Sequence, residues 1–330
     1  MQDLQYHAFQ VRETRDGKYA GSVETLDTAS LPPGEVTIRV HYSSLNYKDA
    51  LSATGNKGVT RSYPHTPGID AAGIVMASES EAIKVGDAVI VTSFDLGMNT
   101  AGGFGQYIRV PADWVVPLPM GLTLEESMIL GTAGFTAAMC LEKITAQVAP
   151  DQGPVLVTGA TGGVASLACA MLIKLGYEVA GVSGKPDPAF LAGLGVSQVI
   201  PRDEFLADSA PPMLKAQWAG VVDTVGGEIL TTAIKSARPW AAVTCCGLVA
   251  SPTLSLTVFP FILRGLSLYG IDSQHYPSVP RRALWERLAG EWKPPALEEM
   301  VTRIRLADLD HAVSEILAGR LKGRTLVDLR

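Results

Sequence analysis

The chain has 330 residues, of which 47% are hydrophobic and 18% charged, and its formal net charge is −6 at pH 7. This composition indicates an ordinary globular protein long enough for two domains, and it excludes extensive disorder. The acidic balance, without a basic stripe, argues against nucleic acid or an anionic membrane as the partner. No apolar run of spanning length and no leader-like start are visible, so we expect a cytoplasmic protein.

The first part of the chain, residues 1–124, predicts a β-rich module. Val36–Tyr42 alternates with period two, and residues 88–91 and 107–110 read as further short strands separated by turn residues. From about Thr123 the pattern changes to that of a helix, with a capping residue followed by Glu126. Residues 323–329 predict a last strand that returns to this module, so we expect about 295–330 to complete it.

The next part, residues 125–294, is organised around the stretch 154–165, Pro-Val-Leu-Val-Thr-Gly-Ala-Thr-Gly-Gly-Val-Ala. It predicts a buried strand, a glycine-rich turn and the start of a helix. Against the dinucleotide pattern G-x-G-x-x-G/A, the key positions are Ala160, Gly162 and Ala165. The free N–H groups and the positive dipole at a helix N-terminus suit a pyrophosphate, although such turns also serve tight packing.

The surrounding pattern supports a nucleotide site. Apolar residues at helical spacing follow the turn, and residues 177–182 predict the next strand, which completes a β-α-β unit. Ser183 and Lys185 then stand where an NAD site places an acid on the ribose and an NADP site places hydroxyls and cations. This balance favours NADPH; the alternative is that Lys185 is a solvated turn residue.

Further strands are predicted at 219–223, 241–247 and 266–271, between helical segments. Strands that alternate with helices indicate a parallel sheet covered on both faces. The fold class predicted for the chain is therefore α/β, with a doubly wound parallel sheet of the Rossmann type beside the β-rich module.

Several segments together resemble the medium-chain dehydrogenase/reductase superfamily over nearly the whole chain, within it the zinc-free quinone-oxidoreductase group and its acrylyl-CoA reductase branch. The segments that carry this resemblance are 43–49 (SSLNYKD), 67–73 (PGIDAAG), 131–137 (GTAGFTA), 158–164 (TGATGGV), 182–185 (VSGK), 201–205 (PRDEF) and 260–264 (PFILR).

The resemblance implies a GroES-like substrate domain with a Rossmann domain inserted, and a homodimer. It also implies NADPH contacts, carried over position by position to Tyr47, Thr161, Gly162, Gly163, Val164, Ser183, Gly184, Lys185, Arg202, Leu248, Ile262 and Ser273. Lys185 departs from the arginine often found in the family and lacks its bidentate fork.

A catalytic zinc ion is not expected. Zinc-dependent relatives have a cysteine where this chain has Asn46 and a His-Glu pair where it has Ile69 and Asp70. A zinc site needs three ligands in place, and none of the cysteines has C-x-x-C spacing. Without a Lewis acid, alcohol oxidation is disfavoured, whereas hydride transfer from NADPH to a polarised C=C bond needs no metal.

The resemblance therefore implies reduction of acrylyl-CoA to propionyl-CoA, with reduction of quinones or enones as the alternative and a non-catalytic NADPH-binding protein as a third possibility. Tyr47 is a candidate proton donor or a residue packed on the cofactor. Asn46 is expected either to bind the cofactor or thioester oxygen or to form a turn. Asp70 either orders the pocket or stabilises a turn. Lys57 and Arg61 are candidate contacts to coenzyme A phosphates or solvated loop charges.

Overall fold

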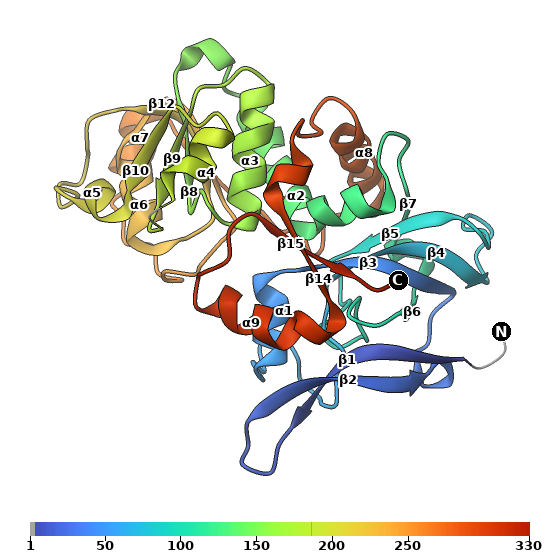
Figure 1. The fold of residues 1–330 in the computed structure, drawn as a ribbon. Helices are drawn as coiled ribbons and strands as arrows, with labels where there is room; N and C mark the ends of the chain where they lie inside the picture. Colours follow the sequence, from blue (N-terminus) through green and yellow to red (C-terminus); the bar gives the residue numbers. More distant parts are fainter. Residues whose placement is uncertain (1–3, 186) are drawn as a thin grey trace. The chain divides into compact units, whose positions relative to one another are not determined.

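The computed structural model describes residues 4–185 and 187–330. The chain forms two compact units, which we describe separately: the first takes in Met1–Thr132, Gln274–Ala289 and Leu297–Arg330, and the second Ala133–Ser273 and Gly290–Ala296. The two units draw on distant parts of the sequence, so the chain leaves the first unit and later returns to it (Figure 1).

The first unit is built on a mostly antiparallel sheet with the order β14-β15-β3-β4-β5-β7, to which β6 adds by pairing with β3. Its strands are β3 (Val36–Leu45), β4 (Asp70–Ser78), β5 (Ala88–Thr92), β6 (Tyr107–Val110), β7 (Val115–Pro117), β14 (Val301–Arg305) and β15 (Arg324–Asp328). Strand β15 runs antiparallel to β3, with Thr325 opposite Leu45. The end of the chain therefore completes the sheet that the N-terminal part begins.

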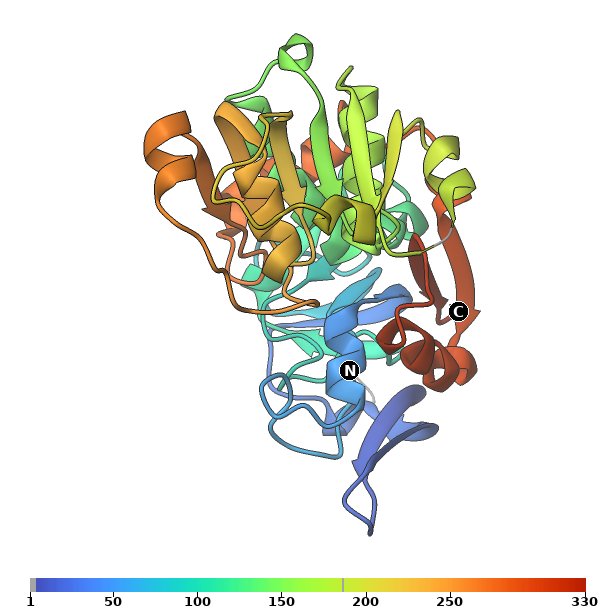
Figure 2. The same cartoon turned by 90° about the vertical axis from the view of Figure 1, so that its left-hand side faces the viewer.

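A hairpin and three helices accompany this sheet. The hairpin strands β1 (Gln5–Glu13) and β2 (Tyr19–Asp27) pair along their whole length, and the hairpin tip extends away from the larger sheet (Figure 2). The helices within the described residues are α1 (Tyr47–Ala53), α8 (Ser278–Ala289) and α9 (Leu309–Leu317). Helices α1 and α9 lie side by side, and buried Ala50 and Leu309 belong to one apolar cluster with the sheet.

The second unit contains a parallel sheet with the order β10-β9-β8-β11-β12-β13. Its strands are β8 (Val155–Thr158), β9 (Val179–Ser183), β10 (Gln198–Pro201), β11 (Trp218–Asp223), β12 (Ala237–Cys245) and β13 (Ser267–Gly270). In chain order this reads 3-2-1-4-5-6, the order of a dinucleotide-binding doubly wound sheet. The predicted α/β class with a Rossmann sheet is confirmed.

Helices cover both faces of this sheet. They are the later part of α2 (Leu124–Thr145), α3 (Gly163–Lys174), α4 (Pro188–Gly193), α5 (Arg202–Leu206), α6 (Gly227–Lys235) and α7 (Phe259–Arg264). The strand order changes direction between β8 and β11, so right-handed crossovers place α3 and α6 on opposite faces (Figure 1). The central strands β8, β9 and β11 are short, fully buried runs, as expected for a sheet covered on both sides.

Residues 125–132 and 274–289, which the sequence pattern places with the Rossmann domain, cluster with the first unit. Two features account for this. Helix α2 is interrupted at Gly131, whose φ of 52° and ψ of −156° are not helical. The guanidinium group of Arg281 on α8 is buried and donates to the carbonyl oxygen of Thr92 on β5 at 3.2 Å, which ties α8 to the first sheet.

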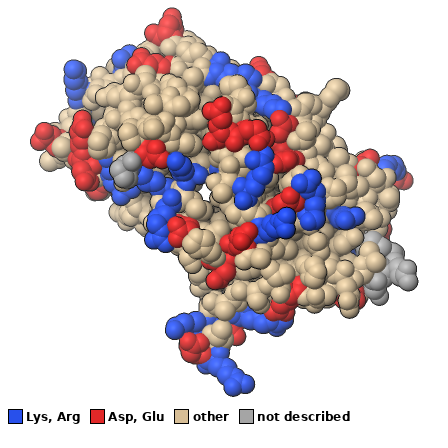
Figure 3. Space-filling view, viewed as in Figure 1, with Lys and Arg blue, Asp and Glu red and all other residues tan. Residues whose placement is uncertain are grey.

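Charged side chains of both signs are interspersed on the face seen in Figure 3, without a broad field of one sign. Within the described part of the chain, no helix combines the length and apolar character needed to cross a membrane.

Candidate functional site

The glycine-rich turn of the second unit joins β8 to α3. Gly159 has a φ of +62°, and the N–H of Gly162 donates to its carbonyl oxygen at 2.8 Å, which closes the turn. Helix α3 begins at Gly163, and its N-cap residue, Gly162, offers no side chain to the first amides. The N–H groups of this first turn therefore remain available to an external acceptor, and the helix dipole favours an anion there.

A buried hydrogen-bond network around Asp223 supports this turn. Asp223, at the end of β11, accepts a hydrogen bond from the hydroxyl of Thr158 at 2.6 Å and from the N–H of Gly226 at 2.8 Å. The hydroxyl of Thr224 donates to the carbonyl oxygen of Thr158 at 2.8 Å. Burial raises the pKa of Asp223, while the hydrogen bonds oppose that shift. The ends of β8 and β11 are thereby fixed to each other beside Gly159.

The end of β9 carries the predicted adenosine-side residues. The hydroxyl groups of Thr161 and Ser183 are 3.3 Å apart, and Ser183 also accepts from the N–H of Lys185 at 3.1 Å. A side chain at Gly184 would come within 2.4 Å of the Arg202 guanidinium, so this glycine leaves room for the arginine. Burial lowers the pKa of the Lys185 ammonium group. The Arg202 guanidinium thus lies beside Gly184, between Ser183 and Lys185 in the chain, and residues of these types fit the ribose 2′-phosphate of NADPH.

The remaining predicted cofactor residues of this unit are more exposed. Leu248, with an exposed fraction of 65%, follows β12, and Ile262, with 68%, lies on α7. Leu248 follows the carboxyl end of β12 and lies against Gly226, so it is at the same edge of the sheet as the turn. Ser273 lies after β13 at the end of the second unit.

The first unit contains a buried polar cluster around Asp70. Its carboxylate accepts from the hydroxyl of Thr132 at 2.6 Å, from the hydroxyl of Ser44 at 2.6 Å and from the side-chain amide of Asn46 at 2.8 Å. These partners come from β3, the following turn and the interrupted helix α2. Asp70 itself is completely buried at the start of β4.

A second carboxylate, that of Asp49, meets the same amide. Asp49 accepts from the backbone N–H of Asn46 at 2.8 Å and from that of Ile69 at 2.8 Å, and its distance to the side-chain nitrogen of Asn46 is 3.3 Å. Burial first, and then the charge of Asp70, raise the pKa of Asp49 to about 7.

Arg324 closes the cluster from the other side. It is 3% exposed, and its Nη1 atom donates to the side-chain oxygen of Asn46 at 3.3 Å while its Nε atom donates to the carbonyl oxygen of Ile129 at 2.8 Å. Burial lowers the pKa of this guanidinium, and Asp70 and Asp49 oppose the shift. Both ends of the Asn46 amide are therefore engaged inside the first unit, which suits a positioning role.

Tyr47 differs from these buried neighbours. It follows Asn46 as the first residue of α1, its exposed fraction is 37%, and its hydroxyl makes no hydrogen bond within the described residues. Lys57 lies over the rings of Tyr19 and Tyr63, 5.2 and 4.7 Å from their centroids. This cation is thus packed on two aromatic faces of its own unit. The N–H of Arg61 donates to the side chain of Asn99 at 3.2 Å.

The residues at the positions of a family zinc site do not suit the metal. Asn46 is committed to the cluster described above, and Ile69 has no ligand atom in its side chain. Among residues 4–185 and 187–330, no group of three or more His, Cys, Asp or Glu side chains is placed to hold a metal ion.

Sequence reasoning missed Arg324, Asp49 and Asp223 as members of these arrangements. Arg324 follows Asn46 by 278 positions, so no local spacing reveals the contact. Asp49 had a usable signal, because Asn followed three residues later by an acid is a helix-start pattern. Asp223 stands at the end of an apolar strand, where polar residues of a parallel sheet gather near a ligand.

Comparison with known proteins identifies the family. Residues 32–120 match the Alcohol dehydrogenase GroES-like domain family, and residues 163–289 match the family described as Zinc-binding dehydrogenase. The chain is 44% identical to the Probable acrylyl-CoA reductase AcuI of Escherichia coli, covering 96% of this chain and 97% of that protein. It is 43% identical to the Putative quinone oxidoreductase YhfP of Bacillus subtilis, covering 93% and 94%.

A solved structure agrees with these relatives. The crystal structure of E. coli YhdH with bound NADPH superposes with a TM-score of 0.94 at 42% identity, covering 98% of this chain and 100% of that one. The expected GroES-like and Rossmann domains are confirmed. Strand order, glycine turn and full-length similarity agree, and the chain belongs to the medium-chain dehydrogenase/reductase superfamily, in the acrylyl-CoA reductase branch of its quinone-oxidoreductase group.

Proposed function

We propose that this protein uses NADPH to reduce the activated C=C bond of acrylyl-CoA to give propionyl-CoA. The observation that carries the cofactor assignment is the open N-terminus of α3 beside Ser183, Lys185 and Arg202. Similarity to a named acrylyl-CoA reductase supports the substrate. Similarity to a putative quinone oxidoreductase keeps quinones and enones as the second candidate.

When bound, NADPH would supply a hydride to the β-carbon of the enoyl thioester. One proton from the protein or solvent would then add to the α-carbon. The chain's own contribution is to bind and orient. The α3 amides bind pyrophosphate, while Ser183, Lys185 and Arg202 bind the 2′-phosphate. We assign Tyr47 to the reacting groups, as the proton donor or as the ring that packs on the cofactor. Asn46 and Asp70 hold Tyr47 at the start of α1 through the buried cluster.

The test is a steady-state panel of acrylyl-CoA, crotonyl-CoA and a soluble benzoquinone, each with NADPH and with NADH. The proposal expects kcat/KM with NADPH to be highest for acrylyl-CoA. A higher value for the quinone favours the second candidate. NADPH binding without turnover of any substrate would contradict an enzymatic role and leave a non-catalytic NADPH-binding protein.

We also propose that the protein is a cytoplasmic homodimer. Large apolar side chains are exposed along one segment of the second unit: Leu254, Val258, Phe259 and Leu263. This segment leads into β13, and no strand among the described residues pairs with the outer edge of β13. A second copy would cover both. The cysteines of the described chain are free thiols, which supports a reducing compartment.

A further inference from the structure

Strand β12 carries a bulge near its amino end. Trp218 of β11 is opposite Ala237, but Gly220 is opposite Ala242, so β12 contains three more residues than β11 over this interval. The extra chain turns Arg238, Pro239 and Trp240 out of the sheet, and the last two are exposed. A bulge of this kind re-aims side chains and is common beside functional sites.

Trp240 is strained as well as exposed. Its φ is +64°, a left-handed conformation that is an outlier for a bulky residue, and its exposed fraction is 77%. One face of the indole lies against Gly265, where a Cβ atom would come within 2.7 Å of the ring. Burial of the indole therefore does not compensate for its backbone conformation. Such strain, held by its surroundings, is concentrated at binding and catalytic sites.

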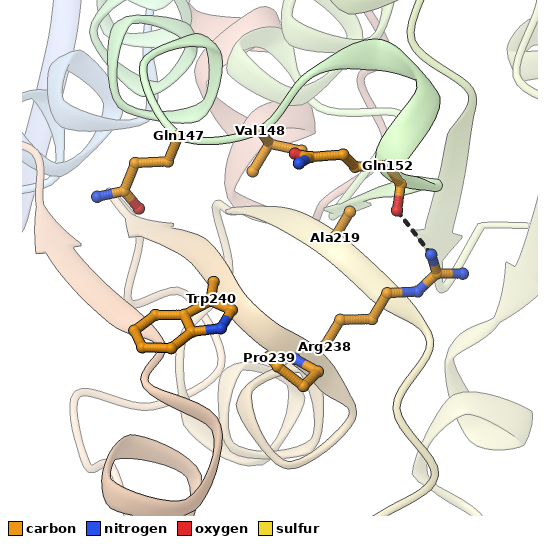
Figure 4. A pocket seen from close by; sticks show the side chains of 7 residues that line it. All are labelled: Gln147, Val148, Gln152, Ala219, Arg238, Pro239 and Trp240. Atoms are coloured by element: carbon orange, nitrogen blue, oxygen red, sulfur yellow. Dashed lines mark hydrogen bonds between the residues drawn. The ribbon is translucent and has the colours of Figure 1, made fainter.

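A hollow of about 270 Å³ lies beside the bulge (Figure 4). Its lining comes from the end of α2, the turn before β8 and the first residues of β11 and β12: Gln147, Val148, Gln152, Ala219, Arg238, Pro239 and Trp240. These are the amino ends of the parallel strands. The glycine-rich turn follows the carboxyl end of β8 in the same unit, so the hollow is a separate place from the cofactor turn.

The polar groups around the hollow include unused donors. Arg238 uses Nη1 to donate to the carbonyl oxygen of Gln152 at 2.6 Å, and its other N–H groups have no partner within the described residues. The side-chain oxygen of Gln152 accepts from the N–H of Ala149 at 2.8 Å, and its side-chain NH₂ has no partner among residues 4–185 and 187–330. The side-chain nitrogen of Gln147 is engaged with the hydroxyl of Tyr269.

The rest of the lining is apolar. Val148, Ala219 and Pro239 contribute hydrocarbon, and Figure 4 shows the Trp240 ring and the Arg238 guanidinium on opposite sides of the hollow, with Pro239 between them. Unused N–H donors of a guanidinium group select an anion, and an exposed indole face selects a flat partner.

We propose that this hollow binds a small anion with a flat conjugated or aromatic body, such as a one-ring aromatic carboxylate. The carboxylate meets Arg238 on the Gln152 side of the hollow, and the ring extends across the hollow toward Trp240. The volume of about 270 Å³ is just below the usual range for sites that take drug-sized ligands, which fits one ring and excludes a dinucleotide.

The test uses benzoate as the probe, with benzamide as its neutral isostere and cyclohexanecarboxylate as an anion without a flat ring. Ligand-observed NMR and tryptophan fluorescence are recorded with the full chain in saturating NADPH, which keeps the cofactor turn occupied. Benzoate should saturate with a Kd of about 1 mM or tighter, and each analogue should bind at least about tenfold more weakly. Equal binding of benzoate and benzamide, or a signal that never saturates, would overturn the proposal.

Variants assign the signal to the bulge. Arg238→Met should weaken benzoate about tenfold or more, whereas Arg282→Met, at an exposed arginine of α8, should leave it unchanged. Trp240→Gly should also lose benzoate binding, yet its Tm should stay the same or rise because glycine accepts the left-handed conformation. Retention of wild-type affinity in either Arg238→Met or Trp240→Gly, with Tm confirming a folded protein, would place the probe elsewhere and refute the site.

Discussion

At the scale of single residues, the first unit buries two carboxylates and one guanidinium around one amide. Asp49 and Asp70 both accept from Asn46, and Arg324 donates to its oxygen. Buried ionic groups persist only when they are hydrogen-bonded, because each carries a large desolvation cost. The arrangement fixes the residue that precedes Tyr47, so the cluster links the buried start of β4 to the start of α1.

The titration of Asp49 gives a prediction about pH. Because burial and Asp70 raise its pKa to about 7 in the folded protein, the folded state holds this proton more tightly than the unfolded state between about pH 4 and pH 7. The associated stability is present at low pH and is lost as the pH rises toward 7. Asp49→Asn removes the titratable carboxyl group and therefore this pH-dependent contribution. The loss in free energy of unfolding that the substitution causes should be about 2 kcal/mol larger at pH 5 than at pH 8.

Urea unfolding at pH 5 and pH 8 measures this difference. Glu81→Gln, at an exposed acid of the same unit, serves as the control and should show no comparable change between the two pH values. If the penalty of Asp49→Asn were the same at both pH values, the Asp49 carboxyl would not hold a proton at pH 5 in the folded state.

Lys185 gives a prediction about cofactor choice. Lys185 follows Ser183 and Gly184 in the chain, and the Arg202 guanidinium lies beside Gly184, where a 2′-phosphate is expected. A charge-assisted contact contributes about 1.5–3 kcal/mol, so Lys185→Asp should weaken NADPH by at least about tenfold and NADH much less. Fluorescence titration with both cofactors measures the ratio. Lys215→Asp, at an exposed lysine of the same unit, controls for net charge; equal losses for NADPH and NADH would remove Lys185 from phosphate recognition.

At the scale of elements, local patterns predicted the β8-α3-β9 unit, and tertiary contacts decided what they missed. The glycine turn and the apolar period of α3 are visible within 20 or so residues, so the sequence revealed them. The break in α2 was missed because Gly131 is surrounded by Asp70 and Ser44, which are distant in sequence. The bulge in β12 was missed because its register is defined only against β11. The contact between Asn46 and Arg324 was missed for the same reason.

The break in α2 gives a prediction about stability. At Gly131, with φ 52°, an added Cβ atom would lie 2.5 Å from the Asp70 carboxylate and 2.6 Å from the Ser44 hydroxyl. Gly131→Ala combines a strained backbone with a clash in the buried cluster, so it should lower the free energy of unfolding by about 3 kcal/mol. Gly193→Ala, where no atom lies within 4 Å, is the matched control and should be neutral or slightly stabilising. Similar unfolding midpoints for the two variants would contradict this account of the kink.

At the scale of the whole molecule, the two edges of the parallel sheet differ. Strand β10 ends at Pro201, and a proline cannot donate to another strand, which protects that edge. Strand β13, Ser267–Gly270, contains no proline and has no neighbour on its outer side within the described residues. The exposed apolar segment 254–263 leads to this second edge. The molecule therefore has one edge suited to solvent and one suited to a partner.

This asymmetry predicts how the proposed homodimer can be separated. Val258 and Leu263 are 63% and 66% exposed in the single chain, so burying a charge at both positions in a dimer would cost several kcal/mol. The double variant Val258→Glu/Leu263→Glu should sediment as a monomer in analytical ultracentrifugation, at concentrations where the natural protein sediments as a dimer. Met120→Glu, at a side chain 98% exposed in the first unit, should remain dimeric. A dimer that survives the double substitution, with Tm unchanged, would place the contact on another surface and leave the open edge of β13 without a partner.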